Sequence, residues 1–179
     1  MGFDRWVVRT LAHHRVGWLT HVARGAMHIG TSLKVLGAVA LVGAVYVVVR
    51  RRWRLGASVV LAVVSSAVVV SVLKAIIDRP RPPHVDALIW VTGPSMPSTH
   101  AARIASAAAG FLLAVEWRNH HARIAVTAAV VLGVVAVGFF LVYLGTHWPT
   151  DVLAGWAIGA AAGTASARIT RRLQPTDSD

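Results

Sequence analysis

Long apolar runs separated by short arginine-rich stretches constrain this chain more than any other feature of its sequence. Runs of Val, Ala, Leu and Gly recur along it, and each is long enough to cross roughly 30 Å of hydrocarbon as a helix. We expect five spans, at residues 33–49, 56–77, 98–116, 123–144 and 150–168. Tryptophans fall near the ends of several runs, as in the aromatic belts of membrane proteins. The sequence therefore predicts an all-α, polytopic membrane helix bundle of about five transmembrane helices.

An amphipathic segment precedes the first run. Residues 3–24 place apolar side chains at helical spacing and keep basic ones largely elsewhere, which is typical of a helix lying in the membrane interface. We do not expect it to span, because His13, His14 and Arg15 would then lie in the middle of the bilayer. We divide the chain into an amphipathic N-terminal segment, a transmembrane domain and a polar C-terminal tail, at residues 1–30, 31–170 and 171–179.

The charge of the chain is strongly positive, with 18 Lys and Arg residues against 7 Asp and Glu residues. Most of the basic residues stand at the ends of apolar runs and not along one polar face, so membrane topology explains them better than nucleic-acid binding. The expected partner is the lipid bilayer. The chain has no cysteine, which excludes disulfides and thiolate metal sites. The first long run, followed by Arg50 to Arg54, is expected to be a retained anchor and not a cleaved signal peptide.

Five spans bring the most polar parts of the membrane domain to one side of the membrane. The second span ends there, the third begins, the fourth ends and the fifth begins. The side chains that meet on this side come from three distant parts of the chain: Lys74, Arg79 and Arg81; Ser98, Thr99 and His100; His147 and Asp151. Most other arginines lie on the opposite side, which the positive-inside rule makes cytoplasmic. The arginines of the N-terminal segment count against this orientation.

His147 and Asp151 stand four residues apart around Pro149, a favourable residue for a first helical turn. A carboxylate one turn away can hold the Nδ1–H of an imidazole and present its Nε2 as a nucleophile or base. Taken alone, such a pair is more often structural.

Two further groups could bind an anion. Lys74 and Arg81 combine a point charge with a guanidinium fork that can hold two phosphate oxygens, although a lysine at the end of a span can also simply reach toward water. Ser98, Thr99 and His100 read as a helix start, where free backbone N–H groups favour negative charge. The alternative for this cluster is an ordinary helix cap beside an incidental histidine.

The convergence of these groups favours phosphoryl transfer, which needs cations on the phosphate oxygens and in-line attacking and leaving atoms. His147 would attack phosphorus, and His100 would protonate the leaving oxygen and then help to activate water. No acidic cluster suited to magnesium is apparent in the sequence, so we expect neither a metal ion nor another cofactor.

This pattern resembles the type 2 phosphatidic acid phosphatase superfamily, in its membrane lipid phosphatase branch. Three motifs between Lys74 and Gly155 carry the resemblance: Lys74 with Arg81-Pro82; Pro97-Ser98-Thr99-His100, with threonine where the family has glycine; and His147 with Asp151. The resemblance implies phosphate binding by Lys74, Arg81 and Ser98, with Thr99 beside them. It implies that His100 is the acid, and that His147 and Asp151 form the nucleophilic pair.

The third motif is only half present, because Phe140-Leu141 occupy the positions of the Ser-Arg pair of the family. Losing an arginine from a phosphate site costs transition-state stabilisation. We take Arg103, one turn after His100 on the same helical face, as the candidate replacement. An arginine reaching toward water at a helix end is an equally good reading of this residue.

The expected function is hydrolysis of the phosphate or pyrophosphate of a lipid, of polyprenyl or phosphatidate type, at the outer leaflet. Two alternatives remain open from the sequence. One is transfer of the phosphoryl group to an acceptor other than water. The other is a degenerate, non-catalytic protein that binds lipid head groups. The sequence does not identify the lipid or the oligomeric state.

Overall fold

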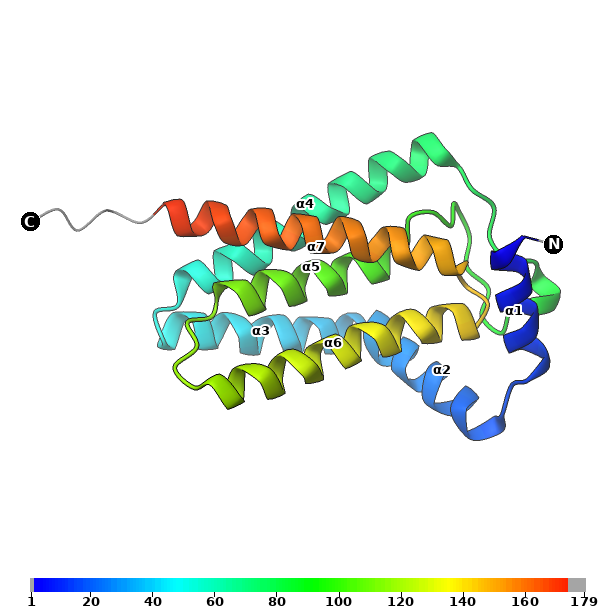
Figure 1. Ribbon diagram of the computed structural model, residues 1–179, viewed down its shortest axis with the longest axis horizontal. Coiled ribbons are helices and arrows are strands. Elements are labelled where there is room, and N and C mark those ends of the chain that lie inside the picture. Colours follow the sequence, from blue (N-terminus) through cyan, green and yellow to red (C-terminus); the bar gives the residue numbers. More distant parts are fainter. Residues whose placement is uncertain (1, 174–179) are drawn as a thin grey trace, which may run out of the picture.

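The computed structural model describes residues 2–173, and all regular structure in that range is helical. In chain order its elements are α1 (Phe3–His13), α2 (Gly17–Thr31), α3 (Leu33–Val49), α4 (Trp53–Ile77), the short 3-10 helix η1 (His84–Asp86), α5 (Thr99–Ala114), α6 (His120–Tyr143) and α7 (Pro149–Arg172). Figure 1 shows them in one view. The predicted all-α class is confirmed, while most of the predicted C-terminal tail, residues 174–179, lies outside the described residues.

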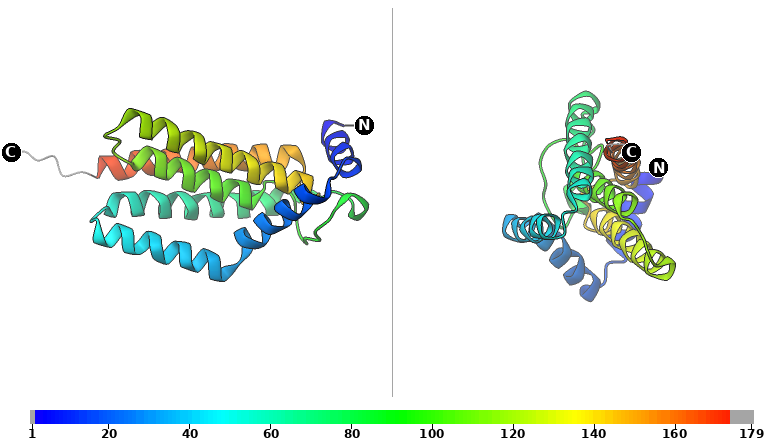
Figure 2. Two further views of the ribbon diagram at one scale, coloured as in Figure 1. Left: turned by 90° about the horizontal axis from the view of Figure 1, so that it is seen from below. Right: turned by 90° about the vertical axis from the view of Figure 1, so that its left-hand side faces the viewer.

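Helices α3 to α7 correspond to the five predicted spans and lie side by side in one bundle (Figures 1 and 2). Their limits agree with the prediction to within a few residues, because charged and helix-breaking residues end each apolar run. By length and hydropathy alone, α4 and α6 are apolar enough to cross a membrane, and α2 with α3 would form a third span bent by 62°. Helix α5 has only 16 residues, and α7 is rich in Ala and Gly, so neither passes this test of length and hydropathy. Both belong to the bundle because they pack against α4 and against each other.

The N-terminal segment differs from the prediction of one helix over residues 3–24: it forms two helices, separated by a break after His13. Hydrogen bonds from Arg15 and Val16 to Tyr143, at the end of α6, stabilise this break. The guanidinium of Arg15 donates to the carbonyl oxygen of Tyr143 at 2.9 Å, and the backbone N–H of Val16 donates to the Tyr143 hydroxyl at 3.0 Å. Because these groups are satisfied by α6 and not by a continuing helix, the chain turns here. Helix α1 then lies across one end of the bundle (Figure 1).

Close packing between α5 and α7 rests on three glycines of α7. A Cβ atom added to Gly155 would lie 2.7 Å from the carbonyl oxygen of Ser98, and one at Gly163 would lie 2.7 Å from that of Ser106. At Gly159 an added Cβ would collide with the carbonyl oxygen of Ala102. Small residues four positions apart let two helix backbones approach within the membrane. These glycines therefore pack two helices of the same chain against each other.

Serines join α4 to α5 in the same region. Ser58 donates to the carbonyl oxygen of Gly110 at 3.1 Å, and the hydroxyls of Ser66 and Ser106 lie 3.0 Å apart. All three serines are buried, so these bonds satisfy polar groups where water is absent. Helix α5 is thus held on two sides, by α4 and by α7.

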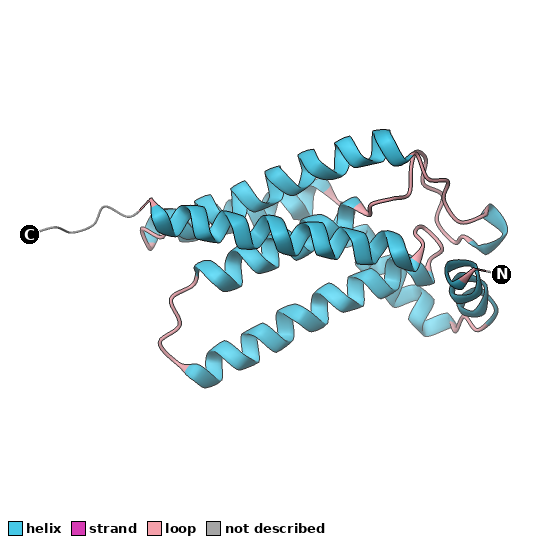
Figure 3. Cartoon of the chain, turned by 45° about the horizontal axis from the view of Figure 1, so that its top comes forward, coloured by secondary structure: helices cyan, strands magenta, loops and turns pink. Residues whose placement is uncertain are grey.

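The topology places the predicted polar clusters at one end of the bundle. The C-terminal ends of α4 and α6, the N-terminal ends of α5 and α7, and the long loop of residues 78–98 all lie at this end, beside α1 (Figures 1 and 3). The other end carries most of the remaining arginines: Arg50, Arg51, Arg52, Arg54, Arg118, Arg123, Arg168, Arg171 and Arg172. The convergence predicted from the number of spans is therefore present in the fold.

Replacing Gly159 by alanine should destabilise the bundle, because its methyl group would meet the backbone of α5. We expect overpacking to cost on the order of 1–3 kcal/mol. A matched control is Gly133→Ala on α6, where no described atom lies within 4 Å of an added Cβ. Thermal unfolding in detergent, followed by tryptophan fluorescence, should show a lower Tm for Gly159→Ala only. Equal Tm values for the two variants would contradict the packing account.

Candidate active site

His147 and Asp151 stand on either side of the start of α7. Pro149 opens the helix, and Asp151 is three residues after the N-cap Trp148, whose backbone N–H donates to Asp151 Oδ2 at 2.9 Å. This cap fixes the carboxylate at the helix start. Nδ1 of His147 lies 3.4 Å from the same Oδ2 and has no closer partner among the described residues. Both side chains are buried, with exposed fractions of 5% and 0%.

His147 and His100 line one cavity of about 240 Å³ at the polar end of the bundle. Its walls are formed by Met27, Arg81, Val91, Thr99, His100, Leu141, Thr146 and His147. The two histidines come from the start of α5 and the loop before α7, so the tight contact between these helices brings them together. A cavity of this volume can hold a small polar group, such as a phosphate, between the two imidazoles.

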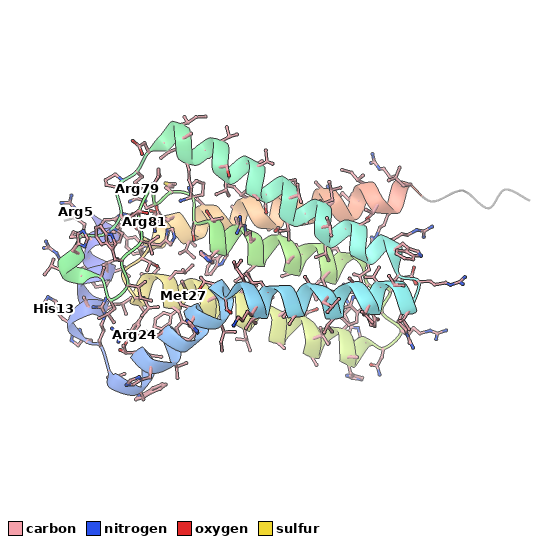
Figure 4. The ribbon with its side chains drawn as sticks, turned by 180° about the vertical axis from the view of Figure 1, so that it is seen from behind. Arg5, His13, Arg24, Met27, Arg79 and Arg81 are labelled. Atoms are coloured by element: carbon pink, nitrogen blue, oxygen red, sulfur yellow. The ribbon has the colours of Figure 1, made fainter. Side chains whose placement is uncertain are left out.

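Arg81 reaches into this cavity from the loop after α4. Its guanidinium donates to the carbonyl oxygens of Gly93 at 2.9 Å and Thr146 at 2.7 Å, and Nη1 lies 3.4 Å from Nε2 of His147. An N–H directed at Nε2 requires a lone pair there, which places the proton of a neutral imidazole on Nδ1, toward Asp151. Nε2 is thus the atom that faces the cavity cation. Figure 4 shows Arg81 and Arg79 at the same end of the molecule.

Burial lowers the pKa of His147; the nearby Asp151 carboxylate raises it, and Arg81 lowers it again. The net direction is downward, so the imidazole is neutral at neutral pH and its Nε2 lone pair is free to act. Burial also lowers the pKa of Arg81, but a guanidinium remains charged.

Lys74 and Arg81 are brought together as predicted. The Lys74 ammonium and Nη2 of Arg81 both donate to the carbonyl oxygen of Pro94, the second at 3.2 Å. Lys74 stands behind Arg81, and its side chain is not among those that line the cavity.

The helix start at Ser98 and Thr99 is also present. The Ser98 hydroxyl caps α5 by accepting from the N–H of Ala101 at 3.4 Å, and its own N–H donates to the carbonyl oxygen of Asp151 at 3.0 Å. Ser98 is fully buried, whereas Thr99 lines the cavity. The ordinary helix cap is therefore present, and it places Thr99 at the cavity wall.

The gap in the third motif has a structural counterpart. Leu141, at the position that the family pattern gives to arginine, lines the cavity with an exposed fraction of 1%. Arg103 lies on the exposed side of α5 and does not line the cavity, although its charge acts on His100. Arg103 therefore lies near His100 but outside the wall of the cavity.

Arg79 is the residue whose contribution the sequence reasoning missed. The sequence places it on the polar side of the membrane without a role, whereas in the structure its Nη1 donates to Asp151 Oδ1 at 2.7 Å and to the Thr150 hydroxyl at 2.7 Å. Its guanidinium also lies over the Trp148 ring, 5.6 Å from the centroid. The available signal was a second arginine two residues before Arg81, in the same proline-rich loop.

Comparison with known proteins identifies the family. The model of the PAP2 superfamily matches residues 55–175. Phosphatidylglycerophosphatase B of Bacillus subtilis (strain 168) is 33% identical over 149 residues, which cover 81% of this chain and 72% of that protein. Undecaprenyl-diphosphatase of Sulfolobus acidocaldarius is 28% identical over 137 residues, covering 72% of this chain and 61% of that protein.

Solved structures agree with this assignment. The crystal structure of the transmembrane PAP2-type phosphatidylglycerolphosphate phosphatase of Bacillus subtilis superposes with a TM-score of 0.83 at 26% identity, covering 97% of this chain and 87% of that one. Aquifex aeolicus LpxE has the same fold, with a TM-score of 0.75 at 23% identity over 94% of this chain and 96% of that one. The chain therefore belongs to the PAP2 superfamily and is a membrane phosphatase of that family.

Proposed function

We propose that this chain hydrolyses the phosphate or diphosphate of a membrane lipid through a phosphohistidine on Nε2 of His147, without a metal ion. The observation that supports this most directly is the single cavity shared by His147, His100 and Arg81, with Asp151 behind His147. An oriented, neutral imidazole facing a cationic cavity has the properties of a phosphoryl acceptor.

In the first step, Nε2 of His147 attacks phosphorus, the N–P bond forms and the bond from phosphorus to the lipid oxygen breaks. His100 donates its proton to the leaving oxygen, so the lipid departs as an alcohol or a monophosphate. Asp151 stabilises the positive charge that develops on the His147 ring. The cations on the phosphate oxygens are Arg81 at the cavity and Lys74 behind it.

In the second step, a water molecule attacks the phosphohistidine. His100, now neutral, takes a proton from this water as the P–N bond breaks, which regenerates neutral His147 and releases inorganic phosphate. Thr99 contributes its backbone N–H at the α5 start to the phosphate oxygens. Ser98 instead caps the helix, because its own N–H donates to the carbonyl oxygen of Asp151. Arg103 is our candidate for the cation that the third motif lacks.

The proposed substrates are polyprenyl or phosphatidate-type lipids. The site lies at one end of a bundle whose helices expose many apolar side chains, so a lipid tail can remain in the bilayer while its phosphate enters the cavity. The named functions of the two curated relatives, a phosphatidylglycerophosphatase and an undecaprenyl-diphosphatase, support this class. The arginines at the opposite end favour an extracytoplasmic site.

Replacing His147 by alanine should abolish phosphate release, because the phosphoryl acceptor is lost. We expect a fall of at least about a thousandfold in kcat/KM. Purified protein in detergent, with EDTA and no added metal, would be assayed for inorganic phosphate on a panel of lipid monophosphates and diphosphates. His121→Ala, at the exposed far end of α6, is the matched control. Equal release by both variants would rule out the assignment, and activity that needs added magnesium would rule out the metal-free mechanism.

Replacing Arg103 by alanine tests whether this residue takes the place of the missing arginine. If its guanidinium contacts the phosphate in the transition state, kcat/KM should fall by about tenfold or more. Arg118→Ala, at the opposite end of the bundle, is the matched control. A loss no greater than that of the control would show that Arg103 only lies at a helix surface.

A further inference from the structure

A network of hydrogen bonds links Asp151 to the first helix of the chain. Arg79 donates through Nη1 to Asp151 Oδ1 at 2.7 Å and through Nη2 to Asp4 Oδ2 at 2.6 Å. The Thr150 hydroxyl donates to the same Asp4 oxygen at 2.6 Å, and the Thr150 backbone N–H donates to Asp4 Oδ1 at 3.1 Å. Both oxygens of Asp4 are therefore bound, and one guanidinium stands between two carboxylates.

The place of Asp4 is fixed by the packing of α1. Val8, one turn after Asp4 on the same face of the helix, has an exposed fraction of 1% and packs in a core cluster with Leu141 and Trp148. Docking of Val8 thus sets Asp4 over Arg79 and the start of α7. The side chain of Asp4 is itself only 15% exposed, so its interaction with Arg79 is shielded from solvent.

The second carboxylate of this network, that of Asp4, changes the electrostatic effect of Arg79 on Asp151. Asp151 alone would be largely neutralised by Arg79, at 2.7 Å, and would offer little negative charge to His147. Asp4 binds the same guanidinium and offsets its charge. The three groups then carry one net negative charge, and Asp151 is the member of the network that faces His147.

We propose that Asp4, acting through Arg79, is a positioning residue that holds the Asp151 carboxylate toward His147 and offsets the positive charge of Arg79 beside it. This inference rests on the proposed function for its catalytic consequence, since it concerns the pair that forms the phosphohistidine. It also assigns a role to α1, which becomes part of the active site and not only a surface helix.

The proposal predicts how His147 titrates. The charged or titratable groups around it are Lys74 from α4, Arg79 and Arg81 from the loop after α4, His100 from α5, Asp151 from α7 and Asp4 from α1. Helices α2 and α6 contribute Met27 and Leu141 to its cavity, which carry no charge. Removing the charge of Asp4 leaves Arg79 uncompensated, so the pKa of His147 should fall further below the ordinary histidine value of about 6.5.

The test compares Asp4→Asn with two other variants. Asp78→Asn makes the same chemical change one residue from Arg79, at an exposed position with φ of 41°, a backbone conformation that asparagine tolerates. Asp4→Glu retains the negative charge. Histidine-labelled protein in detergent would be titrated by ¹⁵N NMR, with the His147 signals assigned from their loss in His147→Ala.

The expected result is a His147 midpoint lower by about half a pH unit or more in Asp4→Asn, with the parent value kept in Asp78→Asn and largely kept in Asp4→Glu. An unchanged midpoint in Asp4→Asn, or an equal shift in Asp4→Glu, would overturn the proposal. This readout needs no substrate, so it decides the role of Asp4 even if no lipid phosphate is hydrolysed.

Phosphate release supplies the second readout. Asp4→Asn should lower kcat by about tenfold with KM within about twofold, and the acid limb of its pH profile should move to lower pH, because misorientation affects the chemical step more than binding. A kcat equal to that of Asp78→Asn would overturn the proposal. So would a loss explained wholly by a smaller folded fraction with an unchanged pH profile. Failure of the proposed function itself would appear differently, as no release by the parent protein.

Discussion

The close approach of α5 and α7 determines the geometry of this site. Glycines on α7 let the two backbones touch, and the N–H of Ser98 donates to the carbonyl oxygen of Asp151 at 3.0 Å where both helices begin. His100 lies two residues after this bond on α5, and His147 lies four residues before it in the loop that leads into α7. The packing of small residues within the membrane thus places two imidazoles on one cavity, although they lie far apart in sequence.

The loop of residues 78–98 and helix α1 complete the site from outside the bundle. Arg81 is held by carbonyl oxygens of the loop and of the turn before α7, so its charge is directed at the cavity. Arg79 faces the opposite way, toward Asp151 and Asp4. Two arginines separated by one proline therefore serve different ends of the His147–Asp151 pair, one at Nε2 and the other at the carboxylate.

The sequence was sufficient to predict the five helices of the bundle, their approximate limits and the convergence of the polar clusters, because apolar runs and topology determine them. It also selected His147, His100, Asp151 and Arg81 as candidate site residues, and the fold brings these four together. It could not predict the break after His13, since Arg15 is held there by carbonyl groups that come from distant parts of the chain. The link from Arg79 to Asp4 was beyond it for the same reason: long-range polar contacts leave no periodic pattern. At Leu141 the sequence was informative in another way. Its departure from the family motif pointed to a position that lines the cavity.

We propose that the phosphoryl group passes through His147. Protein mixed with a lipid phosphate labelled with ³²P, quenched in alkali within milliseconds and digested, would be analysed by mass spectrometry for the labelled peptide. The account predicts an acid-labile phosphate on His147, formed and lost at rates compatible with turnover. Label on another residue, or turnover with no labelled protein at any time, would contradict it.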